Sequence, residues 1–84
     1  MSQPLNLITN KFEELPNNVE AEQSVIGSIL LTNEIFDEVS LIISSKNFYD
    51  PIHKKIFEAL EKLIYAGILA NPITLKNYFE KEKD

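Results

Sequence analysis

The feature that most constrains the fold is the stretch between Asp50 and Gly67, which combines a helix start, a helical apolar pattern and a helix end. Asp50 can cap a helix through its carboxylate, and Pro51 suits the first helical position. Gly67 can adopt the left-handed conformation that commonly ends a helix. The apolar residues between these signals recur with helical spacing; they are Ile52, Ile56, Ala59, Leu60, Leu63 and Ile64. We therefore predict a helix over residues 51–66 with one buried face.

A second helix is predicted over residues 18–31. Asn18 can accept a free backbone N–H of the first turn, and Glu20 places negative charge near the positive end of the helix dipole. Small residues, Ser24, Gly27 and Ser28, gather on one half of this helix, where long charged residues are usual. We therefore expect another element to pack closely there, with a helix crossing at Gly27; the alternative is a lightly polar, exposed face. The other half is apolar and consists of Val19, Ala21, Val25, Ile26, Ile29 and Leu30.

Glu22 departs from the pattern of this helix, because it projects near the middle of the apolar half. Burying a carboxylate without a partner is costly. We therefore expect Glu22 to be held by backbone donors or by a lysine from a neighbouring helix. Full exposure without a partner would contradict this expectation.

Two further helices complete the predicted fold. Thr32 or Asn33 can cap a helix over residues 33–43, and Asn71 followed by Pro72 marks the start of a helix over residues 72–81. No strand-like alternation persists in the sequence. The fold class is therefore all-α, a small compact bundle of about four helices. The predicted inner faces are Ile35, Phe36, Val39, Ile42 and Ile43 in the first of these helices, and Ile73, Leu75, Tyr78 and Phe79 in the second.

Residues 1–16 lack a comparable pattern. They mix polar residues with scattered apolar ones between Pro4 and Pro16, which is typical of a mobile tail or of an arm that docks late. We divide the chain accordingly into a flexible tail, residues 1–16, and a helical head, residues 17–84. The sequence shows neither a secretory signal nor an apolar run approaching the roughly 20 residues that span a bilayer. We therefore expect a cytoplasmic protein without a membrane partner.

Composition and charge limit the classes of function. The 84 residues suffice for one small domain, and 44% of them are apolar, so a core is possible without disulfides. The absence of cysteine excludes a thiolate metal site and fits a reducing compartment. Eight basic and thirteen acidic residues give a net charge of −5. Because a domain that binds phosphates usually has a basic face, this charge argues against nucleic acid as a direct partner and, more weakly, for a basic protein partner.

The sequence contains candidates for chemistry but no complete site. His53 is the only histidine and lies inside the apolar stripe; without a nucleophile motif we interpret it as a packing or capping residue. Glu34, Asp37 and Glu38 lie on one predicted helix, which does not supply the converging oxygens that a hard cation needs. No phosphate-binding, zinc-protease or nucleophile motif occurs. We therefore predict no enzyme activity and no catalytic, cofactor-binding or metal-binding residue in this segment.

Three segments, taken in order, resemble a known family. Residues Glu20–Gly27 read EAEQSVIG and residues Phe48–Phe57 read FYDPIHKKIF; a Leu-x-x-x-Gly pattern then precedes NPITL at residues 71–75. Together they resemble the N-terminal domain of bacterial replicative DNA helicases of the DnaB type, over about residues 16–79. The family more often has Pro-Ile-Asp where this chain has Leu69-Ala70-Asn71. Asparagine can replace aspartate as a cap, so the helix start is retained.

The resemblance implies a function that the residues alone do not show. It implies that this head begins a longer protein, in which a helical hairpin, a linker and a RecA-like motor follow; none of these is recognised within the 84 residues. That motor would use ATP and Mg²⁺ to unwind duplex DNA during chromosome replication. The heads would contact other helicase subunits in the collar of a hexamer and would receive the helicase-binding domain of primase in a primosome. A helicase loader is a further candidate partner.

We therefore expect a non-catalytic assembly and partner-docking domain of a replicative helicase. Two other classes of function stay open. One is a stand-alone helical adaptor, phage- or plasmid-borne, that binds a helicase or primase by mimicking the head. The other is a small DNA-binding helical domain, which the net charge of −5 disfavours. For the isolated chain we expect a monomer or a weak dimer.

Overall fold

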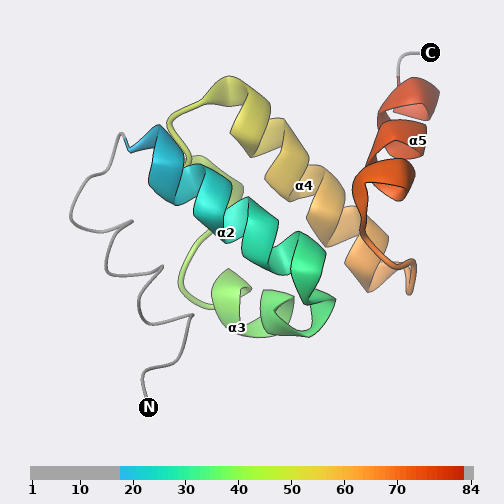
Figure 1. Ribbon diagram of the computed structural model, residues 1–84, viewed down its shortest axis with the longest axis horizontal. Coiled ribbons are helices and arrows are strands. Elements are labelled where there is room, and N and C mark those ends of the chain that lie inside the picture. The colour runs from blue at the N-terminus through green and yellow to red at the C-terminus, as the bar shows by residue number, and fades with distance from the viewer. Residues whose placement is uncertain (1–17, 83–84) are drawn as a thin grey trace.

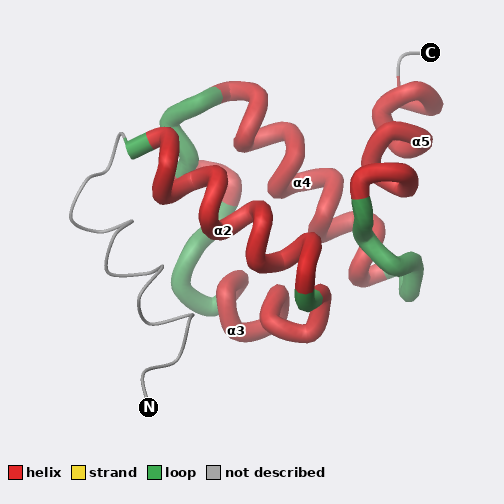
Figure 2. Tube along the Cα trace, viewed as in Figure 1, coloured by secondary structure: helices red, strands yellow, loops and turns green. Residues whose placement is uncertain are grey.

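Six helical segments follow one another in the computed structural model, which describes residues 18–82 (Figure 1). Helices and loops account for this range, without a strand (Figure 2). The predicted all-α class is therefore confirmed, and the helices predicted over residues 18–31, 51–66 and 72–81 agree with the structure to within one residue at each end. The predicted tail, residues 1–16, lies outside the described residues. The α-helices are α2 (Val19–Leu31), α3 (Phe36–Ser40), α4 (Pro51–Tyr65) and α5 (Pro72–Glu82), and the 3₁₀ helices are η1 (Asn33–Ile35) and η2 (Ser45–Asn47).

The ends of α2 and α4 are fixed by the signals that the sequence contains. The Asn18 side chain accepts the N–H of Ala21 at 3.1 Å, and the Asp50 carboxylate accepts the N–H of Ile52 at 2.8 Å. At the end of α4, Gly67 has a φ of 79°. This conformation lets the N–H of Ile68 donate to the Leu63 carbonyl at 2.9 Å, which is a common way to satisfy the last carbonyls of a helix.

The helix predicted over residues 33–43 is shorter and split. It consists of η1 followed by the five residues of α3, and it ends at Ser40. Thr32 makes no side-chain capping bond, and an uncapped first turn commonly tightens into a 3₁₀ helix. The chain then turns, so Ile42 is 52% exposed and does not belong to the core, whereas Ile43 is buried as predicted.

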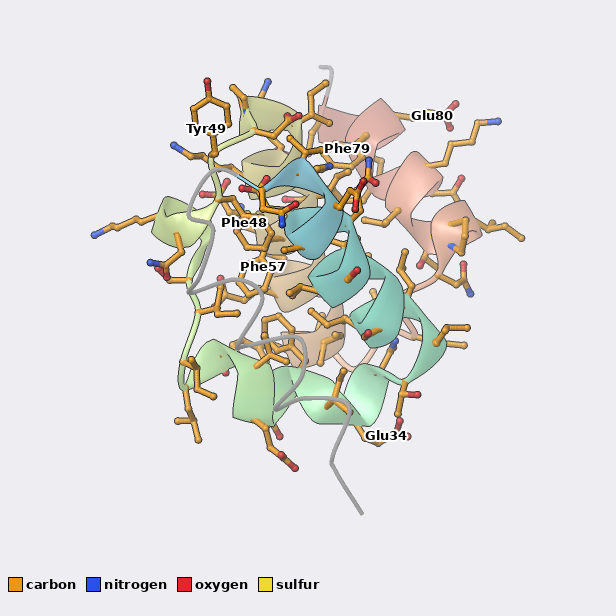
Figure 3. All side chains as sticks on the ribbon, turned by 60° about the vertical axis from the view of Figure 1, so that its left-hand side comes forward. Glu34, Phe48, Tyr49, Phe57, Phe79 and Glu80 are labelled. Carbon is orange, nitrogen blue, oxygen red and sulfur yellow. The ribbon has the colours of Figure 1, made fainter. Side chains whose placement is uncertain are left out.

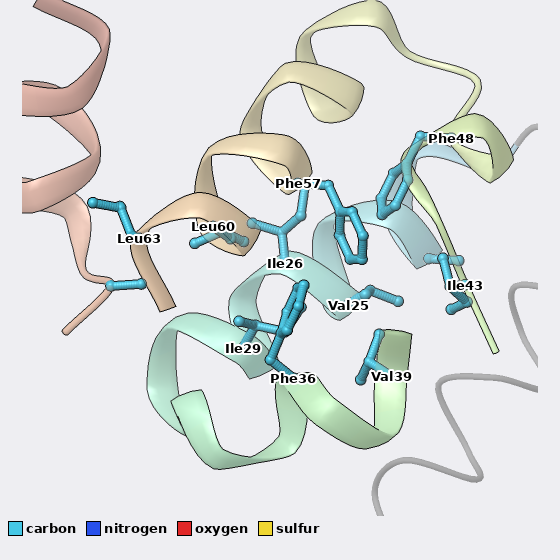
Figure 4. Packing of buried hydrophobic residues seen from close by; sticks show 12 residues of the cluster. Val25, Ile26, Ile29, Phe36, Val39, Ile43, Phe48, Phe57, Leu60 and Leu63 are labelled. Atoms are coloured by element: carbon cyan, nitrogen blue, oxygen red, sulfur yellow. The ribbon is translucent and has the colours of Figure 1, made fainter. Parts of the chain in front are cut away.

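The core lies between α2, α3 and α4 (Figure 4). Phe57 sits at its centre, with ring centroids 5.3 Å from Phe36 and 5.0 Å from Phe48. The helical apolar stripes included Phe36 but neither Phe48 nor Phe57. Phe48 lies in the connection before α4, where no periodicity marks it, and Phe57 lies at the edge of the α4 stripe. The contacts of these rings nevertheless connect the end of η2 to α4 and α4 to α3.

Two isoleucines assigned to inner faces are exposed. Ile52 is 66% exposed in the first turn of α4, and Ile73 is 70% exposed in the first turn of α5. Periodicity gives the direction of a side chain, but burial also needs a neighbouring element at that height along the helix. None of the α5 residues is fully buried; Leu75 and Tyr78 pack against the edge of the core.

No helix of the described range crosses the small face of α2 closely, so the close helix crossing expected at Gly27 is wrong. A Cβ atom added at Gly27 would meet no heavy atom of residues 18–82 within 4 Å. Ser24 on the same face is exposed, whereas Val25 and Ile29 on the opposite face are 1% and 0% exposed. α3 and α4 both pack on the apolar face. The small residues therefore form the lightly polar face that the sequence offered as the alternative.

Candidate functional site

Glu22 is the most deeply buried charged residue among residues 18–82, with 1% of its surface exposed. Its carboxylate accepts the backbone N–H of Tyr49 at 2.6 Å and that of Asp50 at 3.3 Å. The Nδ1 atom of His53 lies 2.8 Å from Glu22 Oε1. We call these four residues the Glu22 cluster. The expectation that backbone donors hold Glu22 is thereby confirmed, with a histidine in place of the suggested lysine.

The Glu22 cluster joins the first half of α2 to the start of α4. A carboxylate oxygen only accepts hydrogen bonds, so His53 must carry its proton on Nδ1 to donate. The acceptor charge also lies near the start of α4, where the helix dipole favours an anion. With Glu22 at 1% and His53 at 8% exposure, the pair offers almost no surface to a substrate. Its geometry is that of a structural link, which agrees with the interpretation of His53 as a packing or capping residue.

The side chain of Asn33 makes a second long-range link that the sequence did not reveal. Its Oδ1 accepts the N–H of Ala70 at 2.7 Å, and its Nδ2 donates to the Ala70 carbonyl at 3.1 Å and to the Ile29 carbonyl at 2.8 Å. We call this arrangement the Asn33 link. It fixes the connection between α4 and α5 to the end of α2. From the sequence, Asn33 is recognisable only as a candidate cap, because a partner 37 residues away leaves no local signature.

A groove opens at this end of the molecule, and we call it the acidic groove. Its volume is about 350 Å³. The acidic side chains project from η1 and α3, and the apolar ones from the end of α4 and the following loop. Glu34 lies at the surface at the opposite end of the molecule from Tyr49 (Figure 3). The groove is lined by Asn33, Glu34, Asp37, Ile64, Ile68 and Leu69, among others.

A second groove lies between α4 and α5 and has mixed charge. Its volume is about 440 Å³, and Lys55, Glu58, Lys62 and Tyr78 are among its lining residues. A hydrogen bond to Tyr78 is the main cause that raises the pKa of Lys62 above its ordinary value. Opposite charges alternate in this groove, so it presents no single sign of charge to a ligand.

Two further classes of site, metal centres and membrane spans, are not found in the described part of the chain. Among residues 18–82, no group of three or more His, Asp or Glu side chains is placed to hold a metal ion. The acidic residues Glu34, Asp37 and Glu38 thus do not form such a group. None of the helices in the same range has the length and apolarity needed to cross a bilayer. Every buried side-chain nitrogen or oxygen in this range has a hydrogen-bond partner, so no orphaned polar atom points to a missing ligand.

Comparison with known proteins identifies the relatives of this chain. The Replicative DNA helicase DnaB of Rickettsia typhi is 38% identical over an aligned stretch of 84 residues. The match covers 93% of this chain and 17% of that protein. The corresponding protein of Rickettsia felis is 44% identical over 69 residues, covering 82% and 14%. That of Buchnera aphidicola subsp. Baizongia pistaciae is 39% identical over 72 residues, covering 86% and 16%. No solved structure gives a significant match.

These relatives are much longer than the region they share with this chain. In the three relatives above, the matched region is 14–17% of the protein. The model of one family, described as the DnaB-like helicase N terminal domain, matches residues 14–84. This range contains every element of the described fold, together with the Glu22 cluster, the Asn33 link and the acidic groove. The chain therefore belongs to the DnaB-like helicase N-terminal domain family.

Proposed function

We propose that this chain is a non-catalytic assembly and partner-docking domain of a replicative DNA helicase. The observation that carries the proposal is membership of the DnaB-like helicase N-terminal domain family over residues 14–84. The geometry supports it, because two side chains that make long-range hydrogen bonds, Glu22 and Asn33, bind the chain's own backbone. Side chains used in this way stabilise a scaffold.

The surface supplies the second line of support. Within the described residues, several large apolar side chains are mostly exposed, among them Leu31, Leu41, Leu69 and Ile73. Single exposed apolar residues are ordinary, but Ile68 and Leu69 both line the acidic groove, and grouped exposed apolar residues are typical of contact surfaces. The net charge of −5 favours a protein partner over a nucleic acid.

The whole protein would supply the activity. In this proposal the domain is the head of a cytoplasmic helicase whose motor uses ATP and Mg²⁺ to unwind duplex DNA. The head would contact other helicase subunits and receive the helicase-binding domain of primase, with a helicase loader as a further candidate. The coding sequence should then continue past Asp84 into a motor with a GxxxxGK[ST] motif, in which backbone N–H groups hold the phosphates.

The direct test is a binding titration between this chain and the helicase-binding domain of primase from the same organism. Calorimetry should give a saturable isotherm, and the chain alone should sediment as a monomer or weak dimer. Absence of binding, or a stable hexamer of the isolated chain, would contradict the proposal. Fluorescence anisotropy with a labelled oligonucleotide at low salt should show no binding; salt-sensitive retention would favour the DNA-binding alternative.

A stand-alone adaptor is the remaining alternative, and binding to primase does not separate it from a helicase head. An adaptor that mimics the head would bind the same primase domain. Its reading frame, however, would end without a motor, and it would associate with helicase rings without being one of their subunits. Reading the gene downstream of residue 84 and pulling down the host helicase with this chain would distinguish the two.

A further inference from the structure

The acidic groove is lined by two kinds of side chain. Glu34 and Asp37 are exposed and stand one helical turn apart, and neither forms an ion pair with any residue between 18 and 82. Three further lining residues form an apolar wall, with Ile68 at 47% and Leu69 at 66% exposure and Ile64 half-buried. No lysine of the described range lines this groove. Its charge is therefore of one sign and is not neutralised by the fold itself.

The apolar wall is held in place although its side chains face solvent. The N–H of Ile68 donates to the Leu63 carbonyl at 2.9 Å. The Thr74 hydroxyl donates to the Leu69 carbonyl at 2.8 Å. The N–H and the carbonyl of Ala70, the next residue, both form hydrogen bonds with the Asn33 side chain. The loop thus presents two apolar side chains from a fixed backbone. A preformed surface loses little conformational freedom on binding, which favours affinity.

From this arrangement we propose that the acidic groove binds a basic amphipathic helix of a partner protein. The apolar face of such a helix would cover Ile68 and Leu69. Lysine or arginine residues on its flank would reach Glu34 and Asp37, because opposite charges at an interface attract and orient the partner. A helix with one apolar face and a basic flank matches a groove that is lined by both kinds of side chain. This inference rests on the proposed docking function and gives it a location and a partner class.

The test begins with a displayed library of random peptides long enough for four helical turns, about 14–15 residues. The library is selected against the whole chain, and enriched peptides are labelled and titrated by fluorescence polarisation. We expect enriched sequences with apolar residues at helical spacing and several Lys or Arg residues, and an affinity that falls as salt is raised. Enrichment of no sequence, or of acidic sequences, would overturn the proposal.

Charge-reversal variants then locate the binding surface. Asp37→Lys should weaken the binding of enriched peptides by at least about tenfold, because it replaces attraction by repulsion at the contact. Glu38→Lys is the matched control: it changes the net charge equally and lies on the same helix, but it does not line the groove. Equal weakening by both variants, or by neither, would overturn the proposal.

A second pair of variants tests the apolar wall. Leu69→Ser should also weaken binding, whereas Leu41→Ser should not, although Leu41 is 86% exposed. Circular dichroism and thermal melting show whether each variant keeps its fold, and both substituted side chains are exposed. If both serine variants bind as well as the parent chain, the groove is not the site.

The outcome for the groove is separable from the outcome for the proposed function. A natural partner that binds this chain but binds Asp37→Lys and Leu69→Ser without loss would place docking elsewhere and overturn the groove alone. A chain that binds the selected peptides at the groove but no replication protein would contradict the proposed function alone.

Discussion

α2 and α5 both pack against α4, but they are held in different ways. α2 contributes Val25, Ile26 and Ile29 to the core, and the Glu22 cluster fixes it to the start of α4. α5 contributes no fully buried residue. Leu75 and Tyr78 pack against the edge of the core, and the Asn33 link holds only the loop that precedes α5. The comparison indicates that the α2–α4 pair carries most of the stability of the fold, while α5 is a lightly attached helix with more surface free for contacts.

The strongest way to break this comparison is to remove the Glu22 carboxylate. Glu22→Ala leaves two backbone donors and His53 without an acceptor in the interior. We expect the free energy of unfolding to fall by roughly 3–5 kcal/mol, as when one partner of a buried pair is lost. Urea denaturation measures it. Glu20→Ala, an exposed carboxylate on the same helix, is the control and should change stability by less than about 0.5 kcal/mol.

Truncation of one leucine in α4 and one in α5 sharpens the comparison. Leu60 is 0% exposed, so Leu60→Ala should cost roughly 2–5 kcal/mol of unfolding free energy through lost burial and a residual cavity. Leu75 is half-buried on α5, and Leu75→Ala should cost less than about 2 kcal/mol. Urea melts of both variants decide the point. Similar losses would mean that α5 belongs to the core as firmly as α2.

The Asn33 link should have a smaller and more local effect. Asn33→Ala removes both partners of the Ala70 backbone, which is 0% exposed. We expect a loss of roughly 1–3 kcal/mol, together with faster amide hydrogen exchange in α5 than in α2. Exchange measured by NMR tests this difference between the helices. Uniform acceleration across the molecule would show that α5 does not open separately.

The smallest expected effect is a gain in stability on the open face of α2. Because no atom of the described residues lies within 4 Å of a Cβ at Gly27, Gly27→Ala should raise the unfolding free energy by roughly 0.5–1 kcal/mol through helix propensity. Thermal melting measures the gain. A loss instead would indicate that this face is covered in solution.

The sequence predicted the helices well because their signals are local. Caps at Asn18 and Asp50 and the end at Gly67 depend on residues within a few positions, and the structure uses all three. The exposure of Ile52 and Ile73 could not be predicted in the same way, since it depends on which elements reach the ends of the helices.

The two polar links show where prediction from sequence succeeds and fails. Glu22 was identifiable because a carboxylate in the apolar half of a helix needs a partner. Asn33 carried no such anomaly, since an asparagine near a helix end is ordinary. The acidic groove was also not predictable, because Glu34 and Leu69 come from segments that only the fold brings together.

The Asn33 link has a consequence for how this surface can diversify. Both of its bonds to residue 70 reach the main chain, so they do not depend on the side chain there, although the complete burial of that position requires a small one. Residues 68 and 69 are also held through backbone hydrogen bonds. Their side chains are exposed and contribute little to the packing of the fold. Substitutions at these two positions should therefore accumulate without changing the fold of the domain. The same scaffold could in this way acquire new binding preferences one residue at a time, while Asn33 stays fixed.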